Sequence, residues 1–208
     1  MYVRDGQTVY LDYGVVIKGT VIFSGVKNAA LKGNGIINAA RIEENLPIYN
    51  GVQVIYSDNI TVEGVTVNNS ESFAYLIGQS ENVTLNNIKA FTCYGASDGV
   101  HIKASENVNL FNSFLRTLDD CVAVNCSNAN YLGESRNINI RGNVFANDGA
   151  HSVLIGAHVS RTHEETVSGV CVSDNDIIES RSHHPVYPGI FAINLGDNGT
   201  ASDSVNIN

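Results

Sequence analysis

Short stretches in which apolar and polar residues alternate recur along the chain, each followed by a polar corner and a second apolar stretch. Five copies begin with Asn and occupy residues 28–36, 59–67, 82–90, 107–115 and 137–145, and residues 170–178 and 204–208 resemble them. Alternation with a period of two indicates strands, and no long stretch shows the 3.6-residue period of a helix. The pattern therefore predicts an all-β protein built from many short strands.

The spacing of these copies predicts how the strands are arranged. The leading Asn residues are separated by 31, 23, 25 and 30 residues. Repeats of this length indicate a solenoid, in which each coil buries its apolar face against its neighbours. A leucine-rich repeat would need an L-x-x-L-x-L frame, which is missing, and a propeller would need a period of about 40 residues. We therefore expect a single parallel β-helix domain over residues 1–208, with about seven or eight coils.

Both ends of the chain lie within this repeat pattern. Residues 6–11 lead directly into a strand pattern, and residues 205–208 stop inside a copy of the repeat. Because a solenoid needs caps over its terminal coils, we expect the chain to be one stretch of a longer β-helix.

The composition agrees with a coil that has polar corners. The chain contains 26 Asn among 208 residues. Asn tolerates left-handed backbone conformations, and identical amides on successive coils can hydrogen-bond as a ladder. Many N-x-S/T sequons arise in such a background, so we interpret most of them as by-products of the ladder. They begin at Asn59, Asn68, Asn82, Asn125 and Asn198.

Charge and targeting signals exclude several partners. The formal net charge of −9 argues against a nucleic acid or an anionic membrane surface as partner. No apolar run approaches the roughly 18 residues that cross a bilayer, and no signal peptide is visible. The cysteines lack the C-x-x-C spacing of a zinc site, so we expect free or structural thiols and no metal or other cofactor. They are Cys93, Cys121, Cys126 and Cys171.

Three acidic residues stand out by their spacing. Asp98 precedes the pair Asp119-Asp120 by 21 residues, which is about one coil. In a β-helix this spacing places Asp98 and Asp119 at the same corner of adjacent coils, with backbones about 4.8 Å apart. Stacked like charges repel, so one carboxyl group should stay protonated and act as a general acid beside ionised partners.

A histidine falls on the next coil. Aligning residues 122–124 with residues 153–155 places His151 over Asp120, and the longer step is explained by a loop over residues 125–136. An Asp pair at a turn is more often a solvated corner or a cap. The recurrence of acids one coil apart, with a histidine beyond them, favours a functional site instead.

Other polar and aromatic side chains lie close to these acids in the sequence. His101 and Lys103 alternate with apolar residues, so both should face outward near the acids, either to bind sugar or as ordinary solvated strand positions. Tyr94 could stack on a sugar ring or pack in the core.

These motifs resemble the polygalacturonase-type glycoside hydrolases of family 28 and their dextranase-like relatives, which are right-handed parallel β-helices. That family carries an N-T-D segment, then G-D-D or Q-D-D, then G-H-G, then R-I-K. Here the first three correspond to Ala96-Ser97-Asp98, Leu118-Asp119-Asp120 and Gly149-Ala150-His151. Every acidic position of the motif is filled, although the neighbouring residues differ.

The resemblance implies hydrolysis of a polysaccharide or oligosaccharide with inversion, by a parent protein that is secreted or extracytoplasmic. Asp119 would protonate the leaving oxygen, Asp98 and Asp120 would hold and deprotonate the attacking water, and His151 would tune the acid. Direct stacking of the carboxyl groups instead suggests a separation of about 5 Å, which is typical of retaining enzymes.

The substrate class and two other functions stay open. No R-I-K follows His151, because residues 188–194 are mainly apolar. The glycan could therefore be neutral, or acidic and gripped by Lys103, Arg161 or Arg181. A polysaccharide lyase with a calcium-binding Asp cluster is one alternative function, but it needs a nearby base. A non-catalytic, glycan-binding β-helix of the tailspike kind is the other.

Overall fold

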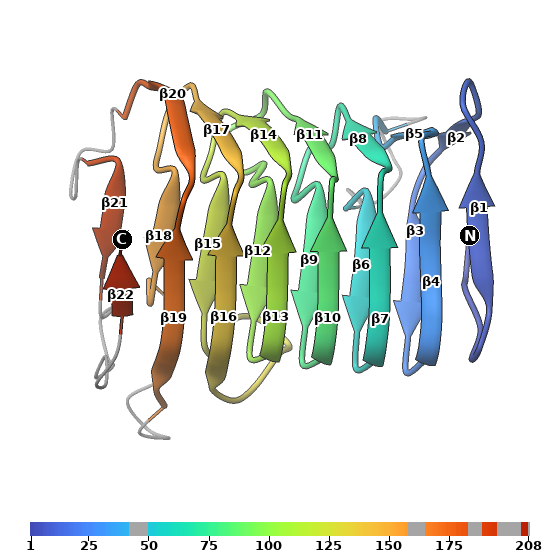
Figure 1. The fold of residues 1–208 in the computed structure, drawn as a ribbon, viewed down its shortest axis with the longest axis horizontal. Coiled ribbons are helices and arrows are strands. Elements are labelled where there is room, and N and C mark those ends of the chain that lie inside the picture. Colours follow the sequence, from blue (N-terminus) through green and yellow to red (C-terminus); the bar gives the residue numbers. More distant parts are fainter. Residues whose placement is uncertain (42–49, 158–164, 183–188, 195–204, 208) are drawn as a thin grey trace.

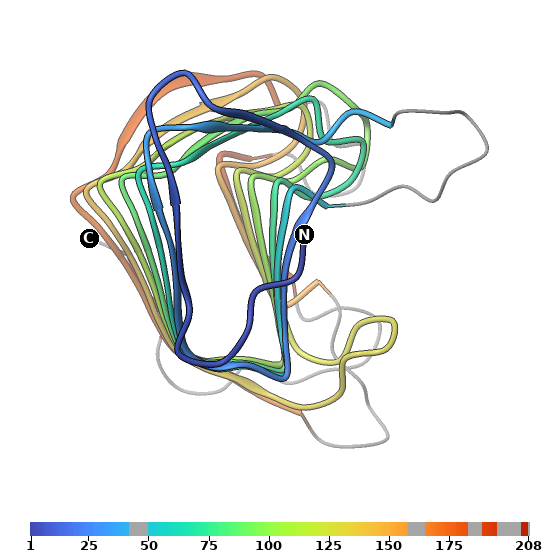
Figure 2. The same ribbon diagram turned by 90° about the vertical axis from the view of Figure 1, so that its right-hand side faces the viewer.

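The architecture is a parallel β-helix, as the repeat predicts. The computed structural model describes residues 1–41, 50–157, 165–182, 189–194 and 205–207. Their strands form three parallel sheets of eight, seven and seven strands. Each coil contributes one strand to each sheet, except that β22 is the one described strand of the last coil. Figure 1 shows the coils stacked along the long axis, and Figure 2, viewed along that axis, shows their outlines superposed. None of the described residues forms a helix long and apolar enough to span a membrane.

The first sheet contains the Asn-led copies of the repeat. Its strands are β1 (Thr8–Leu11), β4 (Lys27–Gly33), β7 (Asp58–Glu63), β10 (Glu81–Asn86), β13 (Glu106–Phe111), β16 (Ser135–Arg141), β19 (Val167–Ser173) and β22 (Val205–Ile207).

Each strand of the second sheet comes after a strand of the first sheet and a tight corner, and β22 alone has no such successor among the described residues. It contains β2 (Val16–Lys18), β5 (Ile36–Asn38), β8 (Thr66–Asn68), β11 (Lys89–Phe91), β14 (Phe114–Thr117), β17 (Val144–Asn147) and β20 (Asp176–Ser180).

The third sheet carries the acids and the histidine of the candidate site near the starts of its strands. It contains β3 (Val21–Ser24), β6 (Val52–Ile55), β9 (Tyr75–Gly78), β12 (Val100–Lys103), β15 (Val122–Asn125), β18 (Val153–Ile155) and β21 (Phe191–Ile193).

The core forms because apolar residues of equivalent strands stack in columns. In the first sheet Ile60 pairs with Val83, Val83 with Val108, and Val108 with Ile138, and all four side chains are buried. The polar residues between them face outward, which explains the alternation seen in the sequence. Each coil therefore buries its apolar side chains against the coils on either side.

The Asn excess has the predicted structural cause. The Asn residues that lead the copies have φ between 53° and 57°, in the left-handed region that Asn tolerates better than most residues. Their amides form the expected ladder in two segments. Asn59 Nδ2 donates to Asn28 Oδ1 at 2.7 Å, Asn107 to Asn82 at 3.2 Å, and Asn137 to Asn107 at 3.1 Å, whereas Asn82 Nδ2 donates to Asp58 Oδ1 in place of Asn59.

The ladder explains only some of the sequons, and the thiols are as expected. Asn59 and Asn82 belong to the ladder, whereas Asn125 is buried beside His101 and Asn198 lies outside the described residues. The four cysteines are free thiols, as their spacing predicts.

A second polar column runs inside the solenoid, and the sequence pattern did not reveal it. The N–H of Ser57 donates to Ser80 Oγ, that of Ser80 to Ser105 Oγ, and that of Ser105 to Ser135 Oγ, at 3.1–3.2 Å. These serines are buried. Each hydroxyl therefore satisfies a corner amide that would otherwise be buried without a partner.

Replacing Asn107 tests the Asn ladder. We expect Asn107→Ala to lower the free energy of unfolding by about 1–2 kcal/mol. Ala is strained in the left-handed conformation of this position, and the substitution removes two amide hydrogen bonds. Asn107→Gly should cost less, since Gly adopts this conformation freely. Urea denaturation measures both variants, and equal losses for Ala and Gly would contradict the backbone part of this explanation.

Candidate functional site

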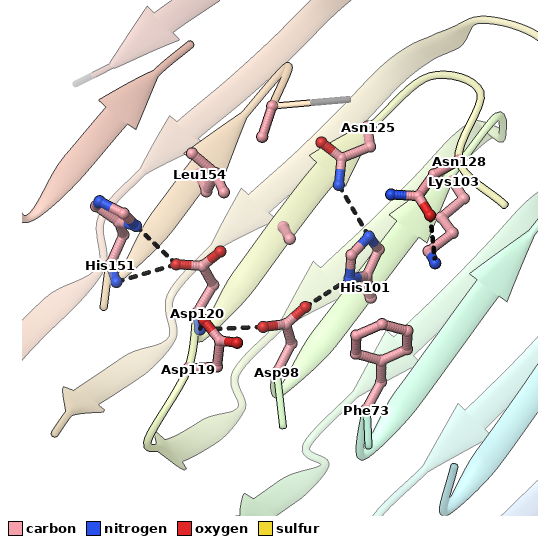
Figure 3. Close-up of a pocket in the computed structure, with 12 residues that line it drawn as sticks. Phe73, Asp98, His101, Lys103, Asp119, Asp120, Asn125, Asn128, His151 and Leu154 are labelled. Atoms are coloured by element: carbon pink, nitrogen blue, oxygen red, sulfur yellow. Dashed lines mark hydrogen bonds and ion pairs between the residues drawn. The ribbon is translucent and has the colours of Figure 1, made fainter. Parts of the chain in front are cut away.

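The predicted acids and His151 line one cavity on the outer face of the third sheet. The cavity has a volume of about 430 Å³. Its lining includes Asp98, Asp119, Asp120 and His151 from the turns that precede β12, β15 and β18. The neighbouring strands add His101 and Lys103 from β12, Ala123 and Asn125 from β15, and Leu154 from β18 (Figure 3).

The strand register sets the order of the acids. Val100 pairs with Val122, and Val122 with Val153, so the residues two positions earlier form a column of Asp98, Asp120 and His151. The N–H of Asp120 donates to Asp98 Oδ1 at 3.1 Å, and the N–H of His151 donates to Asp120 Oδ1 at 3.0 Å. The predicted position of His151 over Asp120 is therefore confirmed.

The prediction that Asp98 and Asp119 stack was wrong by one residue. The strand register advances by 22 residues from Val100 to Val122, so Asp120 follows Asp98 in the column and Asp119 lies beside it. One carboxylate oxygen from each of the three acids lies within 4.8 Å of the others. The three acids still form one cluster, with Asp119 as its half-buried member.

Each buried acid of the column contacts a histidine ring. His151 Nδ1 lies 2.7 Å from Asp120 Oδ1, and His101 Nδ1 lies 2.5 Å from Asp98 Oδ2. The side-chain amide of Asn125 lies 2.8 Å from His101 Nε2. With Asn125 Nδ2 as donor to Nε2, the Nδ1–H of His101 donates to Asp98. His101 faces outward as the alternation predicts, yet it is only 6% exposed because Asp98, Asn125 and the Phe73 ring pack against it.

Burial and mutual repulsion hold protons on the acid cluster. Burial, followed by the charges of Asp98 and Asp120, raises the pKa of Asp119 to about 7. Burial and then the charge of Asp120 raise the pKa of Asp98 well above its usual range. Asp119 faces the cavity and can therefore carry a proton near neutral pH, as a general acid must.

Buried polar groups fix the turn that carries Asp119. The Asp119 carbonyl accepts hydrogen bonds from Thr117 Oγ1 and Asn147 Nδ2, both at 2.6 Å. Asn147 Nδ2 also donates to the His151 carbonyl at 3.1 Å. A Cβ at Gly149 would lie 2.4 Å from the Leu118 carbonyl oxygen, so the close approach of the two coils here requires glycine. These hydrogen bonds and the close approach at Gly149 thus hold the acid and histidine coils against each other.

The structure separates the other candidate binding residues. Lys103 lines the cavity, whereas Tyr94 is 42% exposed and is absent from the described lining, so no described contact supports its predicted role. Arg181 pairs with Glu179 at 2.5 Å, and Arg161 lies outside the described residues. Phe73 and Asn128 also line the cavity, although the sequence did not single them out.

Strand β21, which pairs with β18 one coil beyond His151, lacks basic residues. Leu154 pairs with Ala192 and Ile155 with Ile193, and Asn194 follows. The missing R-I-K segment therefore leaves β21, the strand next to β18, without a lysine or arginine side chain.

The acids are also the group of described residues that could hold a metal ion. Both oxygens of Asp98 already accept hydrogen bonds, from the Asp120 N–H and from His101, and Asp120 Oδ1 accepts from the N–H and the ring of His151. A calcium ion would compete with these donors for the same oxygens, while it needs six to eight oxygen ligands of its own. The hydrogen-bond pattern favours a proton-transfer site.

The raised pKa of Asp119 predicts a pH-dependent stability. A carboxyl group with a raised folded-state pKa favours folding at low pH and loses that contribution as pH rises through about 7. We expect Asp119→Asn to increase the free energy of unfolding by about 1–2 kcal/mol at pH 8, allowing for solvent screening, and to have little effect at pH 3.5. Urea titrations at both pH values measure this difference. Asp176→Asn, at an exposed position on β20, is the control, and an equal gain in the control would contradict the expectation.

Comparison with known proteins agrees with the fold and the motif. Residues 13–183 match the family described as Glycosyl hydrolases family 28. An exopolygalacturonase of Arabidopsis thaliana is 29% identical over 169 residues, which are 80% of this chain and 37% of the relative. A polygalacturonase of Brassica napus is 30% identical over 58% of this chain and 30% of its own length.

Solved structures show the same fold. A polygalacturonase from Erwinia carotovora superposes with a TM-score of 0.67 at 14% identity, over 100% of this chain and 85% of that chain. An exopolygalacturonase from Thermotoga maritima gives 0.64 at 16% identity, over 84% and 57% of the two chains. The chain thus spans less than two fifths of the Arabidopsis relative that it matches over most of its own length. Since the family match extends over most of its residues, the chain belongs to glycosyl hydrolase family 28.

Proposed function

We propose that the chain hydrolyses glycosidic bonds of a polysaccharide at the Asp98–Asp119–Asp120 cluster. The observation that carries this proposal is the placement of three carboxyl groups and His151 in one cavity, with the pKa of Asp119 near neutrality. Glycoside hydrolysis needs one proton donor and one ionised carboxylate beside the bond that breaks. Family membership and the names of the relatives support polygalacturonate as the first substrate to test.

In this proposal Asp119 is the general acid. It is half-buried and faces the cavity, and burial together with its acidic neighbours keeps a proton on it near pH 7. Proton transfer from Asp119 to the glycosidic oxygen would accompany cleavage of the bond to the leaving sugar. The product anion of Asp119 would then take up a proton from solvent.

Asp98 and Asp120 hold the attacking water and accept its proton. Burial raises the pKa of Asp98, but the Asp120 N–H and the charge of Lys103 oppose that rise. In this proposal Asp98 therefore shares the anionic role with Asp120, and Asp119 carries the donated proton. Their backbones are adjacent in the column, and His101 and His151 orient their carboxyl groups. Family membership supports inversion, although one oxygen of each acid lies within 4.8 Å of the others, which is nearer to the roughly 5 Å of retaining pairs than to the roughly 6.5–9.5 Å of inverting ones. The configuration of the product therefore distinguishes the two pathways.

A panel of acidic and neutral polysaccharides tests the function. We expect new reducing ends from at least one glycan, without products that absorb in the near ultraviolet and without sensitivity to chelator. Unsaturated products that disappear with chelator would support the lyase instead. Binding without any cleavage would support a non-catalytic β-helix, and Asp119→Asn serves as the inactive control.

A further inference from the structure

Lys103 is a buried cation whose donors are only partly used. The side chain is 5% exposed, yet its ammonium lines the cavity that holds the acids. Its Nζ donates to Asn128 Oδ1 at 3.1 Å and lies 4.7 Å from the centre of the Phe73 ring. Among the described residues, Asn128 is the one hydrogen-bond acceptor of Nζ, and no carboxylate lies within 4.0 Å of it. Because an ammonium has three N–H donors, two of them are available to a ligand.

The loop between β15 and β16 supplies side chains that surround Lys103. Residues 126–134 connect β15 to β16 and fold back over earlier coils, where Tyr131 packs on Gly78. A Cβ at Gly78 would lie 2.5 Å from the Tyr131 ring, so a larger residue there would displace the ring. Buried Glu165 binds the Oγ and the N–H of Ser127 at the base of this loop. The contacts of Ser127 with Glu165 and of Tyr131 with Gly78 thus hold Asn128 and Tyr131 beside Lys103.

The charges in the cavity are distributed unevenly along the solenoid. Figure 3 shows Lys103 and Phe73 on the side of Asp98 that faces away from His151. Lys103 is the one Lys or Arg in the described lining of the cavity. On the opposite side, the described strand β21 offers Ala192 at the position that pairs with Leu154. Among the described residues, a ligand that crosses the acids would thus meet a lysine ammonium at the Phe73 end.

We propose that Lys103 and Asn128 bind the carboxylate of an acidic sugar unit on the Phe73 side of the bond that is cleaved. A carboxylate there would accept the unused N–H donors of Lys103 and the amide N–H of Asn128, in charge-assisted hydrogen bonds. This inference rests on the proposed function, because it names the charge of the sugar that the same site binds. Lys103 would then determine specificity for acidic sugars, since strand β21 offers no lysine or arginine for that role.

Lys103 also acts on the acids, so its test must separate the two effects. Burial and the charge of Asp120 raise the pKa of Asp98, and the charge of Lys103 partly opposes that rise. Loss of this charge would alter Asp98 whichever ligand is bound. Recognition of a carboxylate, by contrast, concerns only a ligand that carries one.

The experiment measures binding by calorimetry in the Asp119→Asn chain, with trigalacturonate and with its neutral methyl ester as probes. We expect Lys103→Met to weaken binding of trigalacturonate by about 10- to 100-fold and to change binding of the ester by less than about threefold. Lys32→Met, which removes a surface lysine paired with Glu63, should change neither affinity. Lys103→Met should not lower the melting temperature, since it removes a buried charge with unused donors.

Three results would overturn this assignment. They are equal weakening for both probes, unchanged binding of trigalacturonate, and failure of the Asp119→Asn chain to bind trigalacturonate at all. The proposed function is judged separately: hydrolysis of a neutral glycan by the unsubstituted chain would support it even then. Lys103-dependent binding of trigalacturonate by a chain that never cleaves a glycan would support the carboxylate site and refute hydrolysis.

Discussion

Asp119→Asn should lower kcat for glycan hydrolysis by about 10³-fold or more, since a positioned general acid contributes about 10²–10⁴-fold and the sugar alkoxide is a poor leaving group. The same role predicts that kcat/KM of the unsubstituted chain falls as pH rises through about 7, because only protonated Asp119 can donate. Reducing-end assays across pH measure both effects. Circular dichroism should show an intact fold, since the turn is fixed through the Asp119 carbonyl.

The control for this substitution is Asp176→Asn, which removes an exposed acid at the start of β20, away from the third sheet. It should keep the activity of the unsubstituted chain. Undiminished turnover in Asp119→Asn would show that another group protonates the leaving oxygen, and the role assigned to Asp119 would be wrong.

Asp98→Asn should lower kcat by about 10²–10⁴-fold for a different reason, because it removes one of the two carboxylates that activate water. The Asp98 charge is one of the causes that raise the pKa of Asp119. The alkaline limit of the residual activity should therefore move to lower pH. In Asp119→Asn, by contrast, the limit near pH 7 should disappear.

The pH profile of the residual activity distinguishes these two roles. Asn at position 98 can still accept the Asp120 N–H through its Oδ1, so the column itself should persist. If Asp98→Asn kept full activity, or kept the alkaline limit near pH 7, Asp98 would not be coupled to the acid as the structure indicates.

The fold was predictable because the same short pattern, an alternating strand with a left-handed Asn near its start, recurs along the chain. Alternating strands and left-handed Asn corners recur in every copy, so each coil supports the interpretation of the next. The placement of His151 over Asp120 also followed from sequence, since residues 122–124 and 153–155 are similar apolar strands that had to align. Local patterns therefore determined both the architecture and the column of the site.

Contacts between distant residues were not predictable in the same way. The one-residue shift between Asp98 and Asp119 depends on the strand register, which a count between acids does not reveal. Alternation showed that His101 and Lys103 face outward. Their burial, however, depends on packing against Phe73 and on the loop over residues 126–134. The exposed position of Tyr94 likewise depends on the turn that carries it.

The most direct test of the central claim is proton NMR of the first products that the unsubstituted chain releases from the glycan it cleaves. Hydrolysis at the Asp98–Asp119–Asp120 cluster predicts saturated reducing-end signals at the first time point, with inverted anomeric configuration, and none with Asp119→Asn. Signals of an unsaturated sugar, or identical products from Asp119→Asn, would contradict it.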